Sequence, residues 1–155
     1  MMKVEYINPF VLASFSVLET VLGHKPNKGQ LAVQPCSFTS QQLNVVCGVS
    51  GQVAGQVIYG MSLSTADRIA SAMLGAPIKI FDQLAASAIA ELGNMISGNA
   101  MLLLSEQDII CDITPPTMIR GTKIEINTLS IPAIVLPLET EHGEMFITIG
   151  LQIRK

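Results

Sequence analysis

The sequence has few of the residues that metal-dependent and histidine-dependent enzymes use. Histidine occurs only as His24 and His142, and both lie in segments predicted to be loops or turns. Zinc and two-metal sites need several clustered ligands, and a Ser-His-Asp triad needs a histidine base, so the sequence argues against both. A GxxxxGK[ST] loop is also absent, which excludes a P-loop for phosphate binding.

Cysteine is scarce as well. The three cysteines, Cys36, Cys47 and Cys111, form no CxxC pair. Cys111 does not begin a cysteine-phosphatase loop, because Thr117 stands where a C-x5-R motif would have arginine. The odd count, together with the lack of a leader-like N-terminus, predicts reduced thiols in a cytoplasmic protein. We expect all three to be buried structural thiols.

Charge is low, and basic clusters are absent. Only 14% of the 155 residues are charged, the net charge is −3, and the basic residues are scattered, which argues against a nucleic-acid interface. Hydrophobic residues make up 49% and the mean hydropathy is +0.48, but no apolar run reaches the roughly 18 residues of a membrane span. We expect a single domain over 1–155 whose excess apolar surface lies in a core or a homodimer interface.

The order of predicted elements indicates an α+β fold. A helix is predicted to begin at Asn8-Pro9 and to end at Gly23, a short one to begin at Ser64 and end at Gly75, and a long one to span 83–104 after an Asp82 cap. Strand-like segments occupy 32–38, 42–49 and 53–61 and return between 109 and 153. We therefore predict a largely antiparallel six-stranded sheet packed by two long helices and one short helix.

The long predicted helix carries a stripe of small and polar residues. Ser87, Glu91, Asn94 and Gly98 recur at spacings of three and four, which places them on one helix face. Such a stripe can be an ordinary solvated face. However, Asn94 and the glycines at 93 and 98 all weaken a helix interior, and departures from local preference are expected at functional sites. Gly98 also keeps the surface low enough for another chain to approach.

A carboxylate and a carboxamide on one face can assist phosphoryl transfer. An amide can donate to and accept from one water molecule, and so it can fix that water in line with a phosphoryl group. A carboxylate can pair with a lysine of the substrate. The sequence offers no nucleophile, metal ligands or cationic clamp beside Glu91 and Asn94. The phosphoryl group would therefore arrive on a phosphoprotein that supplies its own lysine and Mg²⁺.

Two motifs carry a family resemblance. The pattern Ser87-x3-Glu91-x2-Asn94, with the Asp112-Ile-Thr-Pro-Pro-Thr117 stretch that follows it, resembles the CheC/CheX/FliY family of chemotaxis phosphatases, and most closely its CheX branch. The resemblance extends over nearly the whole chain. It implies a CheC-like fold, a homodimer formed through sheet edges, and hydrolysis of the aspartyl phosphate of the response regulator CheY. It further implies that Asn94 orients the water, that Glu91 binds the regulator's lysine, and that Mg²⁺ sits on the regulator.

One departure from the family pattern narrows the prediction. CheC-type members carry a second ExxN pair on the first helix, whereas here the corresponding positions are Glu19 and Leu22. The resemblance therefore favours one site per chain, with Glu19 a solvated helix residue. Two alternatives remain: a non-catalytic receiver-binding module of the flagellar-switch type, and a dimeric structural domain with an inert stripe. The role of Ser87 stays open between hydrogen bonding or packing near the site and mere small size.

Overall fold

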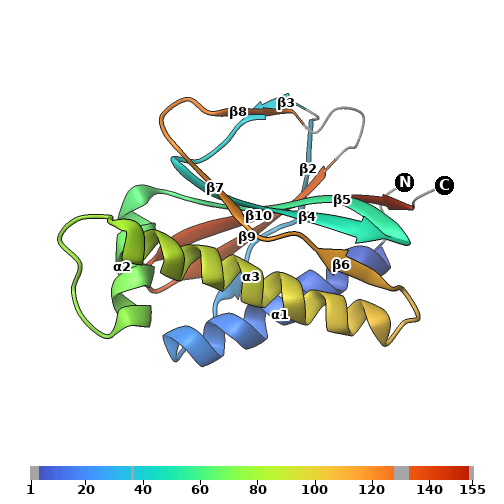
Figure 1. Ribbon diagram of the computed structural model, residues 1–155, viewed down its shortest axis with the longest axis horizontal. Coiled ribbons are helices and arrows are strands. Elements are labelled where there is room, and N and C mark those ends of the chain that lie inside the picture. Colours follow the sequence, from blue (N-terminus) through green and yellow to red (C-terminus); the bar gives the residue numbers. More distant parts are fainter. Residues whose placement is uncertain (1–3, 36, 128–132, 154–155) are drawn as a thin grey trace.

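The chain forms three layers in a computed structural model that describes residues 4–35, 37–127 and 133–153. An antiparallel sheet lies in the middle, three helices cover one of its faces, and a two-stranded sheet lies over the other (Figure 1). The predicted α+β class is therefore confirmed. In the described ranges, every helix falls short of the length or hydrophobicity that crossing a membrane requires.

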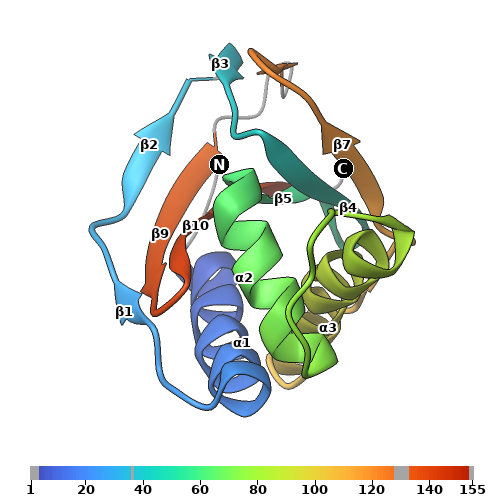
Figure 2. The same ribbon diagram turned by 90° about the vertical axis from the view of Figure 1, so that its left-hand side faces the viewer.

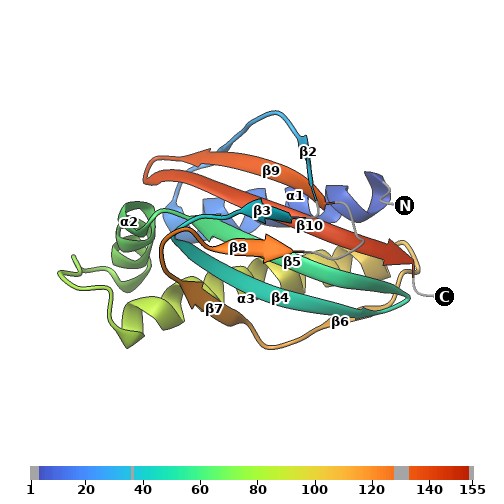
Figure 3. The same ribbon diagram turned by 90° about the horizontal axis from the view of Figure 1, so that it is seen from above.

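The main sheet contains eight described strands. Its hydrogen-bonded order is β1-β9-β10-β5-β4-β6, with β2 also paired to β9 and β7 also paired to β4. The strands are β1 (Asn27–Lys28), β2 (Ala32–Gln34), β4 (Leu43–Gly51), β5 (Val53–Met61), β6 (Cys111–Ile113), β7 (Thr117–Arg120), β9 (Ala133–Thr140) and β10 (Gly143–Ile153). The two-stranded sheet pairs β3 (Ser37–Thr39) with β8 (Glu125–Asn127) above the main one, as Figure 3 shows.

The prediction of six strands was too low. The predicted strand 32–38 divides into β2, which joins the main sheet, and β3, which leaves it to pair with β8. The short β1 was not predicted, because two polar residues carry no alternating pattern. The sequence also predicts a strand over 129–138, which falls partly outside the described residues and whose described part belongs to β9.

The Thr114-Pro115-Pro116 break lies on the outer edge of β4. The strands on either side of it, β6 and β7, both pair with β4. Thr114, which lies between β6 and β7, is also held to β4. Its N–H donates to the Gly48 carbonyl and its Oγ1 accepts from the Gly48 N–H, each at 2.9 Å. The break is therefore a local departure from an edge strand, at a position where proline is tolerated.

The helices are α1 (Val4–Leu22), α2 (Leu63–Leu74) and α3 (Gln83–Ser105). Asp82 caps α3 as predicted, its Oδ1 accepting from the Ala85 N–H at 2.9 Å. The predicted start of α2 was two residues late, since Ser62 is the cap and accepts from Thr65 N–H. The predicted start of α1 was also wrong, because the described helix already includes Val4 and has Pro9 inside it.

The extra turn of α1 has a packing explanation. Tyr6 and Ile7, which precede Pro9, are almost fully buried in the core. Burying two large side chains contributes roughly 3–6 kcal/mol, which offsets the roughly 3 kcal/mol cost of a proline in a helix interior. Sequence rules that place proline at a helix start therefore gave the wrong boundary here.

The helices α1 and α3 lie side by side across the sheet, and α2 covers one end of the sheet (Figure 2). Alternate residues of the central strands point toward this helical layer and form the core with it. The sequence predicts six residues on the apolar side of α3, and five of them join the core: Ala85, Ala88, Ile89, Leu92 and Ile96. The sixth, Leu103, is only half-buried and packs against the edge of the core.

Candidate active site

The predicted stripe lies on the outer face of α3, away from the sheet. Ser87 and Glu91 are exposed, and Asn94 and Gly98 are half-exposed. At 3.6 residues per turn the four positions fall within a sector of about 60°. The structure thus brings all four predicted site residues onto one accessible line along α3.

Among the described residues, the polar side chains of the stripe have no hydrogen-bond or ion-pair partner. None of the side-chain hydrogen bonds or ion pairs found among the described residues involves Ser87, Glu91 or Asn94. A carboxylate and an amide that face solvent in this way remain available to another molecule. The exposed position of Ser87 and its lack of such a bond also argue against a hydrogen-bonding role within the fold.

The opposite side of α3 is fixed to the sheet by a buried hydrogen bond. The Tyr59 and Ser97 hydroxyl oxygens are 2.6 Å apart, and both side chains are essentially fully buried. Burial raises the pKa of the Tyr59 phenol far above its ordinary value, more than the Ser97 hydrogen bond lowers it. The pair therefore stays neutral and ties α3 to β5 one helical turn beyond Asn94.

Gly93 has a structural role that the sequence did not reveal. A β-carbon on this residue would lie 3.0 Å from Val45 Cγ1 and 3.2 Å from Tyr59 Cδ2. Gly93 therefore allows α3 to approach the sheet closely, and its cost to the helix is explained by packing. Gly98 differs, because a β-carbon there would meet nothing within 4 Å. No contact within the described chain accounts for Gly98, which agrees with an open surface left for a partner.

Glu19 is exposed near the end of α1, as predicted for a solvated helix residue, and Leu22 stands where a second ExxN pair would have its amide. The stripe on α3 is therefore unaccompanied by a second pair of that kind on α1. This agrees with one candidate site per chain.

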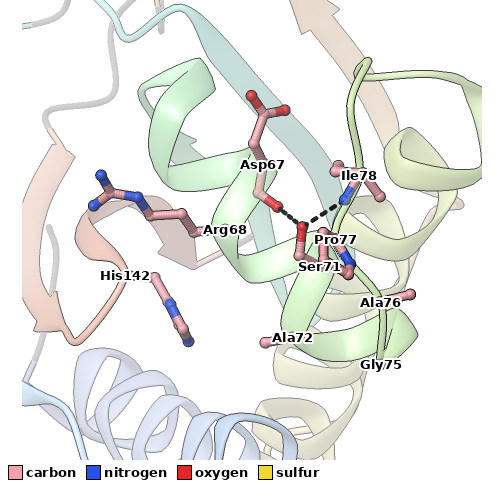
Figure 4. A pocket seen from close by; sticks show the side chains of 9 residues that line it. All are labelled: Asp67, Arg68, Ser71, Ala72, Gly75, Ala76, Pro77, Ile78 and His142. Carbon is pink, nitrogen blue, oxygen red and sulfur yellow. Dashed lines mark hydrogen bonds between the residues drawn. The ribbon is translucent and has the colours of Figure 1, made fainter.

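A hollow in the described part of the molecule lies away from the stripe. It has a volume of about 590 Å³ and is bounded by the end of α2, the following loop and His142 in the β9–β10 turn. In Figure 4, Asp67, Arg68 and His142 point in different directions, so they form no converging cluster. Ser71 fixes the loop, donating to the Asp67 carbonyl and accepting from Ile78 N–H. The hollow thus contains no group of residues arranged for catalysis.

Cysteine and histidine are arranged as structural residues. Cys47 and Cys111 are buried and free, as predicted, whereas Cys36 lies outside the described residues. Burial raises the pKa of the Cys47 thiol, which disfavours the reactive thiolate. His24 accepts from the Glu141 N–H at 3.0 Å and thereby supports the β9–β10 turn. The described residues contain no group of three or more metal-ligating side chains.

The sequence analysis missed two residues that extend the stripe. Leu84 and Leu102 are 62% and 65% exposed. They lie on the same face of α3, so that the six positions from Leu84 to Leu102 occupy a sector of about 80°. Continuing the three- and four-residue spacing in both directions from Ser87 and Gly98 would have found them.

Comparisons with known proteins relate the chain to chemotaxis proteins. A family model described as "Chemotaxis phosphatase CheX" matches residues 43–139. The CheY-P phosphatase CheX of Thermotoga maritima is 32% identical over 146 residues, which cover 94% of each chain. A crystal structure of a chemotaxis protein CheX from Desulfovibrio desulfuricans is 30% identical, with a TM-score of 0.86 over 97% of this chain and 100% of that one. The CheX–CheY–BeF3–Mg²⁺ complex from Borrelia burgdorferi is 27% identical, with a TM-score of 0.84 over 97% and 99%.

Proposed function

The chain belongs to the CheX family of chemotaxis phosphatases, and on that premise we propose how its α3 stripe acts. Its activity is hydrolysis of the aspartyl phosphate of a CheY response regulator. The observation that carries the mechanism is that Glu91 and Asn94 share one exposed face of α3 and that neither side chain makes a hydrogen bond or ion pair with the described part of the chain.

Asn94 orients the attacking water. Its carboxamide carries both an acceptor oxygen and donor N–H groups, so one amide can hold a water in a fixed orientation. Being uncharged, it can approach the phosphoryl oxygens without repelling them. Phosphoryl transfer depends mainly on such positioning and on neutralising charge. The helix that carries Asn94 is held to the sheet by the Tyr59–Ser97 hydrogen bond, so the amide is presented from a rigid element.

Glu91 fixes the receiver in register. Its carboxylate lies one helical turn before Asn94 and can form a charge-assisted hydrogen bond with the lysine of the receiver's active site. Binding that lysine orients the acyl phosphate toward Asn94. The Mg²⁺ that neutralises the phosphoryl oxygens is held by the receiver, as the Mg²⁺-containing complex of the Borrelia protein suggests. On this account the site is complete only when the two proteins are docked.

We further propose that the chain acts in the cytoplasm as a homodimer that pairs through a sheet edge. Both ends of the main sheet are formed by short strands, β1 and β2 beside β9, and β6 and β7 beside β4. Unpaired backbone groups on such strands can pair with a second copy. Sedimentation of the purified chain tests this part separately, and a monomer at all concentrations would contradict it.

The mechanism is tested by separating turnover from binding. Wild type, Asn94→Ala and Glu91→Gln are mixed with the CheY proteins of the same organism, phosphorylated with acetyl phosphate, and the loss of phosphate is followed. The control is Gln56→Ala, which removes an exposed amide from the sheet face opposite the helices. Asn94→Ala should retain binding to the beryllofluoride-activated receiver and lose turnover, Glu91→Gln should weaken binding, and Gln56→Ala should behave as wild type. Full turnover by Asn94→Ala would refute the mechanism.

A further inference from the structure

A second surface of unusual composition lies between α1 and α3. A hollow of about 350 Å³ opens between the two helices, and Leu12 and Leu102 are among the residues that line it. Their exposed fractions are 59% and 65%, among the larger values for apolar residues in the described part of the chain. Ser16, Asn99 and Glu106 add polar groups around this apolar centre. An apolar centre with a polar rim is the usual composition of a protein-binding surface.

The hollow lined by Leu12 and Leu102, called the Leu12–Leu102 groove below, is continuous with the stripe. Leu102 lies eight residues after Asn94 on the same face of α3, a separation of about 12 Å along the helix axis. A specific interface covers about 800 Å² of each partner, which corresponds to a disc about 16 Å in radius. A receiver domain centred on Glu91 and Asn94 therefore extends as far as Leu102. The same protein that brings the phosphoryl group to Asn94 is the one that covers the groove.

The charge of α1 and α3 indicates what kind of side chain can lie against the groove. Neither α1 nor α3 contains a lysine or arginine, whereas Glu5, Glu19 and Glu91 lie on them and Glu106 caps α3 beside the groove. A partner that presents an apolar side chain next to a basic one complements both the Leu12–Leu102 centre and the Glu106 rim.

We infer that the Leu12–Leu102 groove is a second anchor for the phosphorylated receiver, in which an apolar receiver side chain is buried about one helix diameter from the reaction centre. The inference rests on the proposed function, since it assigns the groove to the same partner. It separates two tasks within one interface. Asn94 acts on the reacting phosphoryl group, and the groove determines how tightly and in which orientation the receiver is held.

The test uses Leu102→Gln, which changes an exposed side chain and so should leave the fold intact. Ile153→Gln is the matched control, because Ile153 is 49% exposed and lies on β10, between β9 and β5 inside the main sheet. The affinity of each full-length variant for the beryllofluoride- and Mg²⁺-loaded CheY of the same organism is measured by calorimetry. Dephosphorylation of the phosphorylated receiver is then measured over a range of receiver concentrations, and the oligomeric state is measured by sedimentation.

We expect Leu102→Gln to raise both Kd and KM about 10-fold and to leave kcat unchanged, with Ile153→Gln like wild type. Leu12→Gln should have the same effect, and the double variant should add little, since both residues line one hollow. An unchanged Kd for Leu102→Gln would overturn the inference while leaving the Asn94 mechanism standing. Dissociation of a dimer by Leu102→Gln would also overturn it, because the groove would then be covered by a second copy. If the wild type neither binds nor dephosphorylates the receiver, the proposed function itself fails.

Discussion

The two glycines of α3 should respond in opposite ways to the same substitution. In Gly93→Ala the new methyl group is directed into the sheet, 3.0 Å from Val45 Cγ1 and 3.2 Å from the Tyr59 ring. In Gly98→Ala the methyl group enters open space. The gain in helix propensity is the same in both variants. The difference between their free energies of unfolding therefore measures how closely α3 must approach the sheet.

The magnitudes follow from these contacts. Replacing glycine by alanine in a helix interior stabilises by about 1 kcal/mol. Gly98→Ala should gain most of this amount, which raises Tm by about 2–4 °C for a chain of this size. Gly93→Ala gains it too but overpacks the core, at a cost of about 1–3 kcal/mol. The net effect at Gly93 should be a loss of up to about 2 kcal/mol, with a fall in Tm.

Urea unfolding and thermal denaturation of the two variants measure these differences directly. Comparing the midpoints at an unchanged urea m-value ensures that stability alone has changed. A Gly93→Ala protein stabilised as much as Gly98→Ala would refute the close packing of α3 on β4 and β5. In the phosphatase assay, Gly98→Ala should weaken receiver binding despite its greater stability, because it adds bulk to the docking face.

Two further predictions concern the buried hydroxyl and thiol groups beneath α3. Tyr59→Phe removes the 2.6 Å hydrogen bond to Ser97 and should lower the free energy of unfolding by about 1–2 kcal/mol; a urea titration measures this, and no loss would show that the bond does not stabilise the packing of α3. Burial raises the pKa of both Cys47 and Tyr59 above their ordinary values of 9.0 and 10.0, so above about pH 9 the unfolded chain loses protons that the folded chain retains. The free energy of unfolding should therefore be unaffected by these groups below that pH and should fall above it. Urea titrations of wild type and Tyr59→Phe across this pH range test the assignment. The free energy of unfolding should fall less steeply with pH in Tyr59→Phe than in wild type, and two parallel curves would contradict the assignment.

The sequence was most informative where one side-chain pattern determines one element. The Asp82 cap and the 3.6-residue periodicity placed α3 to within one residue of its observed end, and Gly75 ended α2 as expected, in the left-handed conformation with φ of 73°. Elements that depend on distant partners were not predictable in this way. β3 and β8 pair across 86 residues of sequence in register with each other, and nothing local to either segment encodes that pairing. The start of α1 depended on the burial of Tyr6 and Ile7, which local proline rules do not include.

The candidate site was located from sequence because its residues lie on one helix. Glu91 and Asn94 needed only helical spacing to be placed together. The reason for Gly93 was not accessible, since it depends on Val45 and Tyr59 of two other elements. The Leu12–Leu102 groove was missed for the same reason, because it joins α1 to α3 and exists only once the two helices pack side by side.

The central claim is that Asn94 acts on the reacting water rather than on binding, and a single-turnover experiment tests it most directly. Phosphorylated receiver is mixed with a saturating excess of wild type or Asn94→Ala, and the first-order loss of phosphate is recorded alongside receiver alone. We predict that wild type accelerates the loss and that Asn94→Ala, bound with near-native affinity, reduces the acceleration about 100-fold or more. Acceleration by Asn94→Ala at the wild-type rate would contradict the account.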